Sequence, residues 1–198
     1  MNILLEMTAD KIASQAESTT NDEIYRSTEP MLWDLFKAFP ENKESYQIAA
    51  KVLLLDKLCS TRLFRYKKQE FLPQLVENIR TIPDFDERVA SGDPSVVCEI
   101  YRGFDKKLFS FATKYCCLHN TVIYSRDDYS IFDSTVRRLL PKYAKSVGVK
   151  LSGTQLDQWY KKDNYEAFNT AVNVVLNAAE INIENRKRKF DLFLWSQR

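Results

Sequence analysis

Residues 94–115 read PSVVCEIYRGFDKKLFSFATKY, and they contain two apolar helical segments separated by a short connection with one glycine. The pair Asp93-Pro94 is suited to begin the first helix, because aspartate is a favoured cap and proline tolerates the first helical position. We expect a tight turn at 102–105 and a second helix that begins at Lys106 or Lys107. The stretch therefore predicts two consecutive helices joined by a hairpin.

The sequence on both sides of this stretch also has helical character. Four glycines and six prolines are few for 198 residues, which favours long helices over the many turns of a β fold. Gly92 is suited to end a short helix, and Pro30 is expected in the first turn of another. Apolar periodicity and capping residues predict further helices at about 10–17, 29–39, 43–61, 68–79, 133–147, 164–180 and 183–196. We therefore expect an all-α fold.

Composition excludes several classes of protein. The 29 lysines and arginines nearly balance the 27 acids, and the net charge of +2 neither requires nor excludes a nucleic-acid partner. The N-terminal sequence has too short an apolar run for a signal peptide. The most hydrophobic internal run, IAAKVLLLDKL at 48–58, contains three charges and cannot be a membrane span. We expect a soluble, cytoplasmic protein that does not contact a membrane.

The cysteines do not form a metal motif. Cys59, Cys98 and the adjacent pair Cys116 and Cys117 lack the spacing of a zinc site or an iron–sulfur cluster. His119 has no partner histidine and is expected at a helix end. We therefore expect no metal and no cofactor, with Cys116 and Cys117 as buried, reduced thiols.

A second stretch, YSIFDSTVRRLL at 129–140, places Asp133 at the start of a helix. Arg137 and Arg138 follow one turn later. Aspartate is a common helix cap, so a purely structural role for Asp133 is the simplest interpretation, and a catalytic aspartate can also serve as a cap.

Together the two stretches resemble the helix-hairpin-helix (HhH-GPD) superfamily of DNA glycosylases. Residues 107–114, KLFSFATK, are most similar to the archaeal 8-oxoguanine DNA glycosylase (AGOG) branch, and 132–138 resemble the family's V-D-T-H-V-x-R stretch. The resemblance covers about 94–140, with a weaker similarity at 55–63. Only Gly103 remains of the family's L-P-G-V-G hairpin, and Arg62 stands where a glutamine is usual.

The resemblance implies an architecture. One globular unit, 1–198, would have a lobe at 41–132 that carries the hairpin, and a second lobe formed by 1–40 and 133–198. A cleft would lie between the lobes.

The resemblance also implies a function, which is excision of a damaged or modified base from double-stranded DNA by a monomer, with or without an AP-lyase step. Lys107 would be the Schiff-base nucleophile, and Asp133 the carboxylate that stabilises positive charge on the sugar. The positive end of the helix dipole and neighbouring Lys106 would both disfavour the charged form of Lys107. The residues expected to contact DNA are Arg102, Gly103, Phe104, Lys106, Arg137 and Arg138.

Two alternatives concern the nucleophile and the activity. Lys114 lies one heptad after Lys107, on the same helix face, and 19 residues before Asp133. It is the rival nucleophile. The chain could instead be a catalytically inactive helical DNA-binding or interaction protein, or a helical protein unrelated to DNA.

Trp195 is expected in the core rather than in a base-stacking site.

Overall fold

The structure is a computed structural model that describes residues 4–59, 61, 63, 70–104 and 108–197, with the backbone alone at 24, 25 and 27. These residues form eleven α-helices and no strand, so the predicted all-α fold is confirmed. The helices are α1 (Ala9–Thr20), α2 (Glu23–Ala38), α3 (Ser45–Cys59), α4 (Phe71–Arg80), α5 (Phe85–Ser91), α6 (Ser95–Ile100), α7 (Phe109–Tyr124), α8 (Ser134–Ser146), α9 (Gly153–Lys161), α10 (Tyr165–Ala178) and α11 (Arg186–Trp195).

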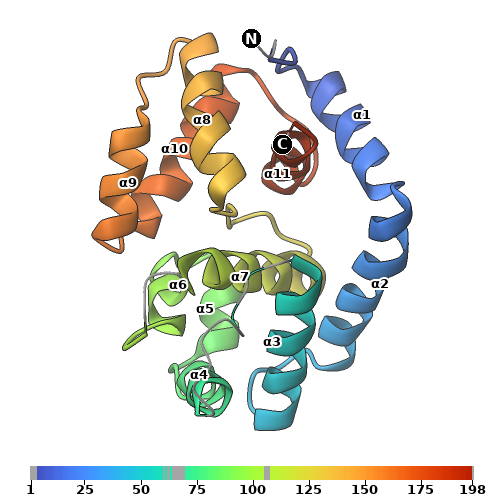
Figure 1. The fold of residues 1–198 in the computed structure, drawn as a ribbon, viewed down its shortest axis with the longest axis vertical. Helices are drawn as coiled ribbons and strands as arrows, with labels where there is room; N and C mark the ends of the chain where they lie inside the picture. The colour runs from blue at the N-terminus through green and yellow to red at the C-terminus, as the bar shows by residue number, and fades with distance from the viewer. Residues whose placement is uncertain (1–3, 60, 62, 64–69, 105–107, 198) are drawn as a thin grey trace.

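The helices gather in two groups (Figure 1). Helices α3 to α7 lie in one half of the view and α8 to α11 in the other, while α1 and α2 run along one side of both. Helix α1 contacts α11, and α2 contacts α3 and α7. The segment 125–133 leads from α7 to α8 and crosses from one group to the other.

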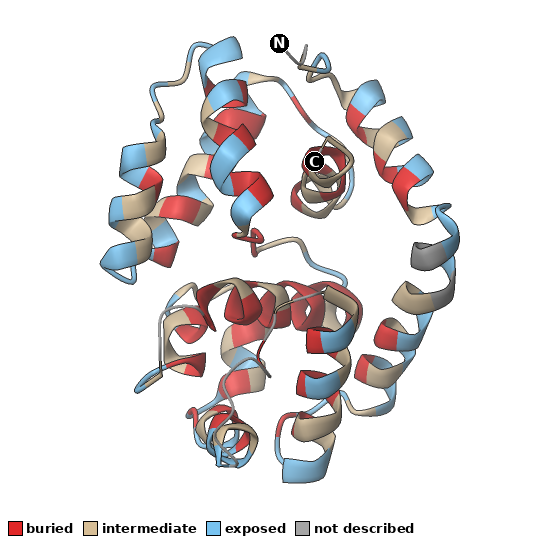
Figure 2. Ribbon diagram, in the orientation of Figure 1, coloured by how far each residue is buried: buried red, intermediate tan, exposed pale blue. Residues whose placement is uncertain are grey.

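Helix α7 is the most enclosed element of the fold (Figure 2). Twelve of its residues are buried, and they occur on every side of the helix. Phe109 begins it, with its ring 5.1 Å from that of Phe132, which in turn lies 5.0 Å from Phe168 of α10. Edge-to-face contacts of this kind add to the free energy gained from burial alone. The aromatic contacts therefore join α7, the crossing segment and α10.

Two helix ends follow the capping signals in the sequence. Gly92 ends α5 with φ +79°, and a side chain there would meet Cβ of Asp128 at 2.8 Å, so both conformation and space require glycine. Asp133 precedes α8, and its side chain accepts hydrogen bonds from the amides of Thr135 and Val136. Both predictions are confirmed.

Two helices differ from what the sequence predicts. The second helix begins at Glu23, so Pro30 lies inside it rather than in its first turn. Burial of Leu32 and Phe36 on the inner face of α2 offsets the cost of an interior proline, which is about 3 kcal/mol. Pro141 also lies inside a helix, α8, whose extent agrees with the predicted 133–147. Helix α9 was not expected, because only Leu156 of this mostly polar helix is buried.

The division into two lobes remains a prediction. One hydrophobic cluster contains residues of α2, α3, α7, α8, α10 and α11, so the two groups of helices share a core. The predicted hairpin between α6 and α7 includes 105–107, which lie outside the described residues. No helix in the described ranges is long and apolar enough to cross a membrane.

Candidate functional site

Lys114 and Asp133 lie beside each other. Nζ of Lys114 is 4.0 Å from Oδ2 of Asp133, and it donates a hydrogen bond to the carbonyl oxygen of Cys59 at 3.2 Å. The two side chains are 13% and 18% exposed, so solvent reaches both only in part. The rival nucleophile proposed from the sequence thus has the proposed carboxylate as its neighbour.

The position of Lys114 follows from the packing of α7. Its chain neighbours Thr113 and Tyr115 are fully buried, whereas Lys114 itself is only partly buried. Lys114 lies in the second turn of α7, away from the helix N-terminus. Its amine therefore lies near a carboxylate and a carbonyl, rather than at the positive end of the helix dipole.

Asp133 is held by the crossing segment that precedes it. The amide of Phe132 donates to Oγ1 of Thr113 at 3.1 Å, which fixes the segment to α7. The hydroxyl of Tyr165 accepts from the amide of Ser130 at 2.8 Å and donates to its carbonyl at 2.9 Å. These bonds determine where α8 begins and hence where the carboxylate of Asp133 lies.

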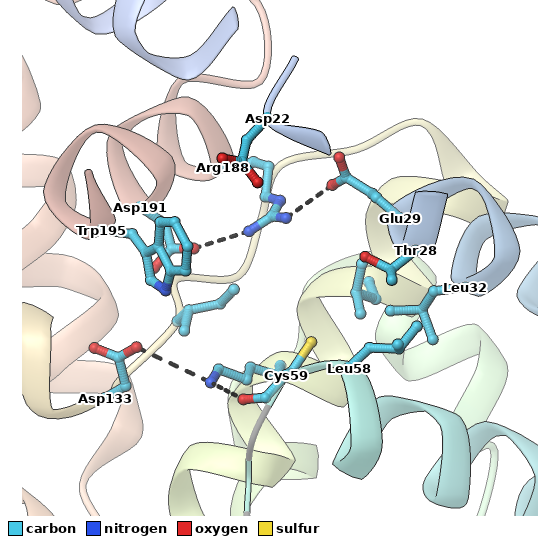
Figure 3. Close-up of a pocket in the computed structure, with 13 residues that line it drawn as sticks. Asp22, Thr28, Glu29, Leu32, Leu58, Cys59, Asp133, Arg188, Asp191 and Trp195 are labelled. Carbon is cyan, nitrogen blue, oxygen red and sulfur yellow. Dashed lines mark hydrogen bonds and ion pairs between the residues drawn. The ribbon is translucent and has the colours of Figure 1, made fainter. Parts of the chain in front are cut away.

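The two groups line a pocket of about 230 Å³ (Figure 3). This volume is below the roughly 300–1,000 Å³ typical of sites for drug-sized ligands, so a single ring system suits it better. The pocket is formed by the connection before α2, by α2, α3, α7 and α11, and by the crossing segment. Its lining residues are Asp22, Thr28, Glu29, Leu32, Leu58, Cys59, Lys114, Leu118, Ile131, Asp133, Arg188, Asp191 and Trp195.

The wall facing Lys114 carries an ion-pair network that the sequence analysis missed. Arg188 bridges two carboxylates, at 2.8 Å from Glu29 and 2.8 Å from Asp191. Burial raises the pKa of Asp191 to about 6, although Arg188 opposes this shift. The available signal was the spacing of Arg188, Asp191 and Trp195, which places all three on one face of α11.

Trp195 was expected in the core, and this prediction is wrong. The residue is only partly buried, and it lines the pocket beside Asp191, on the side of Asp133 (Figure 3). Trp195 is the last residue of α11, so this end of the helix lies at the pocket.

The segment with the weaker family similarity also reaches the pocket. Leu58 and Cys59, at the end of α3, line it, and the Cys59 carbonyl accepts from Lys114. Arg62 lies outside the described residues.

Of the remaining predicted site residues, none that the structure describes lines the pocket. Lys106 and Lys107 lie outside the described residues. Arg102 is 74% exposed, with Glu99 3.9 Å away, and Gly103 has φ +83°. The ring of Phe104 packs edge-on against Phe71 at 5.6 Å.

The two arginines of α8 have partners of their own. Arg137 is 2.5 Å from Asp157, and Arg138 donates to the carbonyl of Gln197 at 3.2 Å. Both are exposed on the outer side of α8.

His119 was expected at a helix end, but it is fully buried within α7. Its Nε2 lies 3.0 Å from Asp86, and burial lowers its pKa. Asn42 joins this pair to Lys51, whose pKa burial lowers to about 8. The members of this network do not line the pocket. Cys116 and Cys117 are buried free thiols, as predicted.

Comparisons with known proteins give a family and one relative. The model of the HI_0787_N family, an N-terminal domain, matches residues 9–128. A protein of Haemophilus influenzae (strain ATCC 51907 / DSM 11121 / KW20 / Rd), described as uncharacterized, is 30% identical over 127 residues. The match covers 61% of this chain and 54% of that protein, so the chain spans about half of the relative's length. No solved structure matches. The family match includes Lys114 and ends before Asp133.

Proposed function

We propose that this chain, which belongs to the HI_0787_N N-terminal domain family, is a DNA glycosylase that excises a damaged or modified base from double-stranded DNA. We also propose that α6 and α7 form a helix-hairpin-helix, that a cleft separates two lobes, and that the protein is a cytoplasmic monomer. The observation that carries it is the approach of the Lys114 amine to the Asp133 carboxylate, 4.0 Å, within one pocket.

Of the two candidate lysines, Lys114 is the one we assign as nucleophile. When an amine and a carboxylate line the same pocket, the amine can attack a carbon and the carboxylate can stabilise the positive charge that develops there. The amine of Lys114 lies 4.0 Å from the carboxylate of Asp133, and both side chains line the same pocket. The 19-residue separation of Lys114 and Asp133 resembles the spacing of lysine and aspartate in the main branch of the HhH-GPD superfamily, which favours this assignment.

The reaction would begin with extrusion of the target base from the helix into the pocket, as enzymes that act on bases require. The neutral amine of Lys114 then adds to C1′ of the sugar while the bond from C1′ to the base breaks, with both bonding electrons going to the base. The amine proton passes to Asp133. The carboxylate also stabilises positive charge on the sugar in the transition state.

The covalent product determines whether a lyase step follows. Opening of the sugar ring gives a Schiff base between C1′ and Nζ of Lys114. Loss of a C2′ proton from this species would break the strand on the 3′ side, which is the AP-lyase step.

Phosphates would be held outside the pocket. Arg102 is well exposed at the turn after α6, and Gly103 has a backbone conformation that favours glycine. We propose that this turn, with Phe104 and Lys106, contacts one stretch of backbone, and that Arg137 and Arg138 contact another.

Reduction with borohydride tests the proposal. Duplexes that each carry one modified base, or an abasic site, are incubated with the protein and reduced, and a stable protein–DNA adduct is measured on a denaturing gel. We expect an adduct with the wild type and with Lys142→Ala, a control lysine outside the pocket. Lys114→Ala should lose more than about 90% of it, because the nucleophile is absent.

Two other outcomes have definite meanings. An adduct lost in Lys107→Ala but retained in Lys114→Ala would transfer the nucleophile to Lys107. Duplex binding without adduct or base release across the whole panel would instead support the catalytically inactive DNA-binding protein.

A further inference from the structure

Four titratable side chains meet in the core around Asn42, which lies in the connection between α2 and α3. The backbone amide of Asn42 donates to Oδ2 of Asp86 at 3.0 Å, and its Nδ2 donates to Oδ1 at 2.6 Å. Its Oδ1 accepts from Nζ of Lys51 at 3.0 Å and from the hydroxyl of Tyr115 at 2.5 Å. Nε2 of His119 lies 3.0 Å from Oδ1 of Asp86. One asparagine therefore joins the connection to α3, α5 and α7.

Asn42 is also the buried residue of this connection, which spans 39–44. It is 4% exposed, whereas 40, 41, 43 and 44 are exposed. Lys51 strengthens the attachment, because it is fully buried and donates a second hydrogen bond to the carbonyl oxygen of Glu41 at 3.1 Å. An exposed stretch of chain is thus held to the core by a single set of buried hydrogen bonds.

His119 is the one histidine in the chain, and it belongs to this set. Because Nε2 faces a carboxylate, the proton of the neutral ring lies on Nε2 and is donated to Asp86. Nδ1 is buried and has no hydrogen-bond partner among the described residues. Phe36, Phe85 and Tyr124 surround the ring, with centroids 6.0, 5.8 and 5.6 Å away. Nδ1 therefore meets aromatic surroundings rather than water.

A second proton on this ring would be costly. It would create a buried N–H without an acceptor, and it would give the network an excess positive charge, because Lys51 and Asp86 balance while His119 is neutral. Burial and the nearby charge of Lys51 lower the pKa of His119, although Asp86 opposes them. The closed arrangement thus favours the neutral ring.

The other described titratable groups around the ring keep their charge state between pH 5 and 7. Burial raises the pKa of Tyr115 and that of Tyr124, the latter to about 12. Burial lowers the pKa of Lys51 only to about 8. Although burial opposes it, hydrogen bonds from His119 and Asn42 hold the pKa of Asp86 below its usual value. His119 is therefore the member of the network that titrates in this range.

From this geometry we propose that His119 is an acid-sensitive switch that holds the connection 39–44 on α5 and α7 at neutral pH and releases it in mild acid. Protonation of Nδ1 destabilises the closed arrangement. When Asn42 withdraws, water reaches the ring and solvates the new N–H. Because the solvated ring has its ordinary pKa of 6.5 and the closed ring a lower one, the open form gains in population as the pH falls below 6.5. The proposal does not depend on the proposed glycosylase activity.

Hydrogen exchange of the full chain tests the switch. Exchange is measured by mass spectrometry at pH 7.5 and pH 5.0, and each rate is divided by the intrinsic rate of an unstructured peptide at the same pH. We expect the protection of peptides that cover 39–51 to fall about tenfold at pH 5.0, because the open form binds the proton more tightly. Peptides of α10 should keep their protection.

Three variants separate the titrating group from its surroundings. His119→Gln keeps an amide donor for Asp86 and does not titrate, so its protection at 39–51 should be equal at the two pH values. Tyr115→Phe removes one bond to Asn42, and it should lower protection at both pH values while the dependence on pH remains. Asp191→Asn removes a buried group outside the network whose pKa burial raises to about 6, and it should leave the dependence unchanged.

The proton NMR resonance of the single histidine ring reports protonation directly. Its midpoint should lie below 6.5 and should rise toward 6.5 in Tyr115→Phe, because a weaker closed arrangement opposes protonation less. This comparison decides the matter if His119→Gln does not fold. Equal wild-type protection at the two pH values, a dependence retained in His119→Gln, or a midpoint of 6.5 or above would overturn the switch. Because no DNA is present, each result is independent of the glycosylase proposal.

Discussion

The two carboxylate oxygens of Asp133 have different partners. Oδ1 accepts from the amides of Thr135 at 2.8 Å and Val136 at 2.9 Å, which caps α8, while Oδ2 is the oxygen nearest to Lys114. Capping and chemistry are therefore compatible roles of one side chain. Asparagine caps a helix about as well as aspartate does, so substitution separates the two roles.

We expect Asp133→Asn to retain the cap and lose the activity. Its free energy of unfolding should stay within about 0.5 kcal/mol of the wild type, while single-turnover base release falls at least about 100-fold because the charge is gone. Asp133→Ala should lose the activity and also about 1 kcal/mol of stability. Denaturant unfolding and base release on the same samples measure both effects. Wild-type activity in Asp133→Asn would reduce the residue to a helix cap.

At the scale of elements, α7 and the crossing segment bring the two proposed catalytic groups together. Lys114 belongs to the helix and Asp133 to the end of the segment, and the hydrogen bond from the Phe132 amide to Thr113 joins them. Thr113 precedes Lys114, as Phe132 precedes Asp133. This bond therefore connects the neighbours of both groups.

Removal of the Thr113 hydroxyl should test this link. Thr113→Val keeps the shape but leaves a buried amide without its acceptor, which costs about 1–3 kcal/mol. We expect stability to fall by that amount and base release by the folded protein to slow, whereas Thr113→Ser should restore most of both. Thermal unfolding and single-turnover release provide the measurements. An unchanged rate in folded Thr113→Val would show that the bond stabilises the fold without positioning Asp133.

Local signals at this scale predicted helix ends better than helix extents. Gly92 and Asp133 were identified because the left-handed conformation and the cap each favour particular residue types. Pro30 does not mark the start of a helix, because packing of the inner face of α2 outweighs the local cost of an interior proline. Helix α9 did carry a signal, the reciprocal pair of Ser152 and Gln155 at its start.

At the scale of the whole molecule, the proposed DNA contacts lie outside the pocket, on residues that would meet the backbone rather than the base. Arg102 is 74% exposed, compared with 53% for Arg137, and Glu99 lies 3.9 Å from it. Contacts of this kind set affinity without reading sequence or damage.

Arg102→Ala should accordingly weaken binding to damaged and undamaged duplexes by the same factor. The slope of log affinity against log salt should also become shallower by about one, since one fewer counterion is released. Fluorescence anisotropy over a salt series measures this, with Arg80→Ala on exposed α4 as the control for loss of a positive charge. A change confined to the damaged duplex would place Arg102 in base recognition instead.

The sequence by itself determined the helical class, the two caps, the buried thiols and the pair of candidate nucleophiles, because each depends on residues within one or two turns of each other. Only the tertiary structure decided which polar groups share a pocket. Glu29 and Arg188 are 159 residues apart, and nothing local in either stretch indicates that they meet. Their pairing, and the exposure of Trp195 to the cavity, follow from how α2, α7 and α11 pack, which depends on the whole core rather than on any one segment.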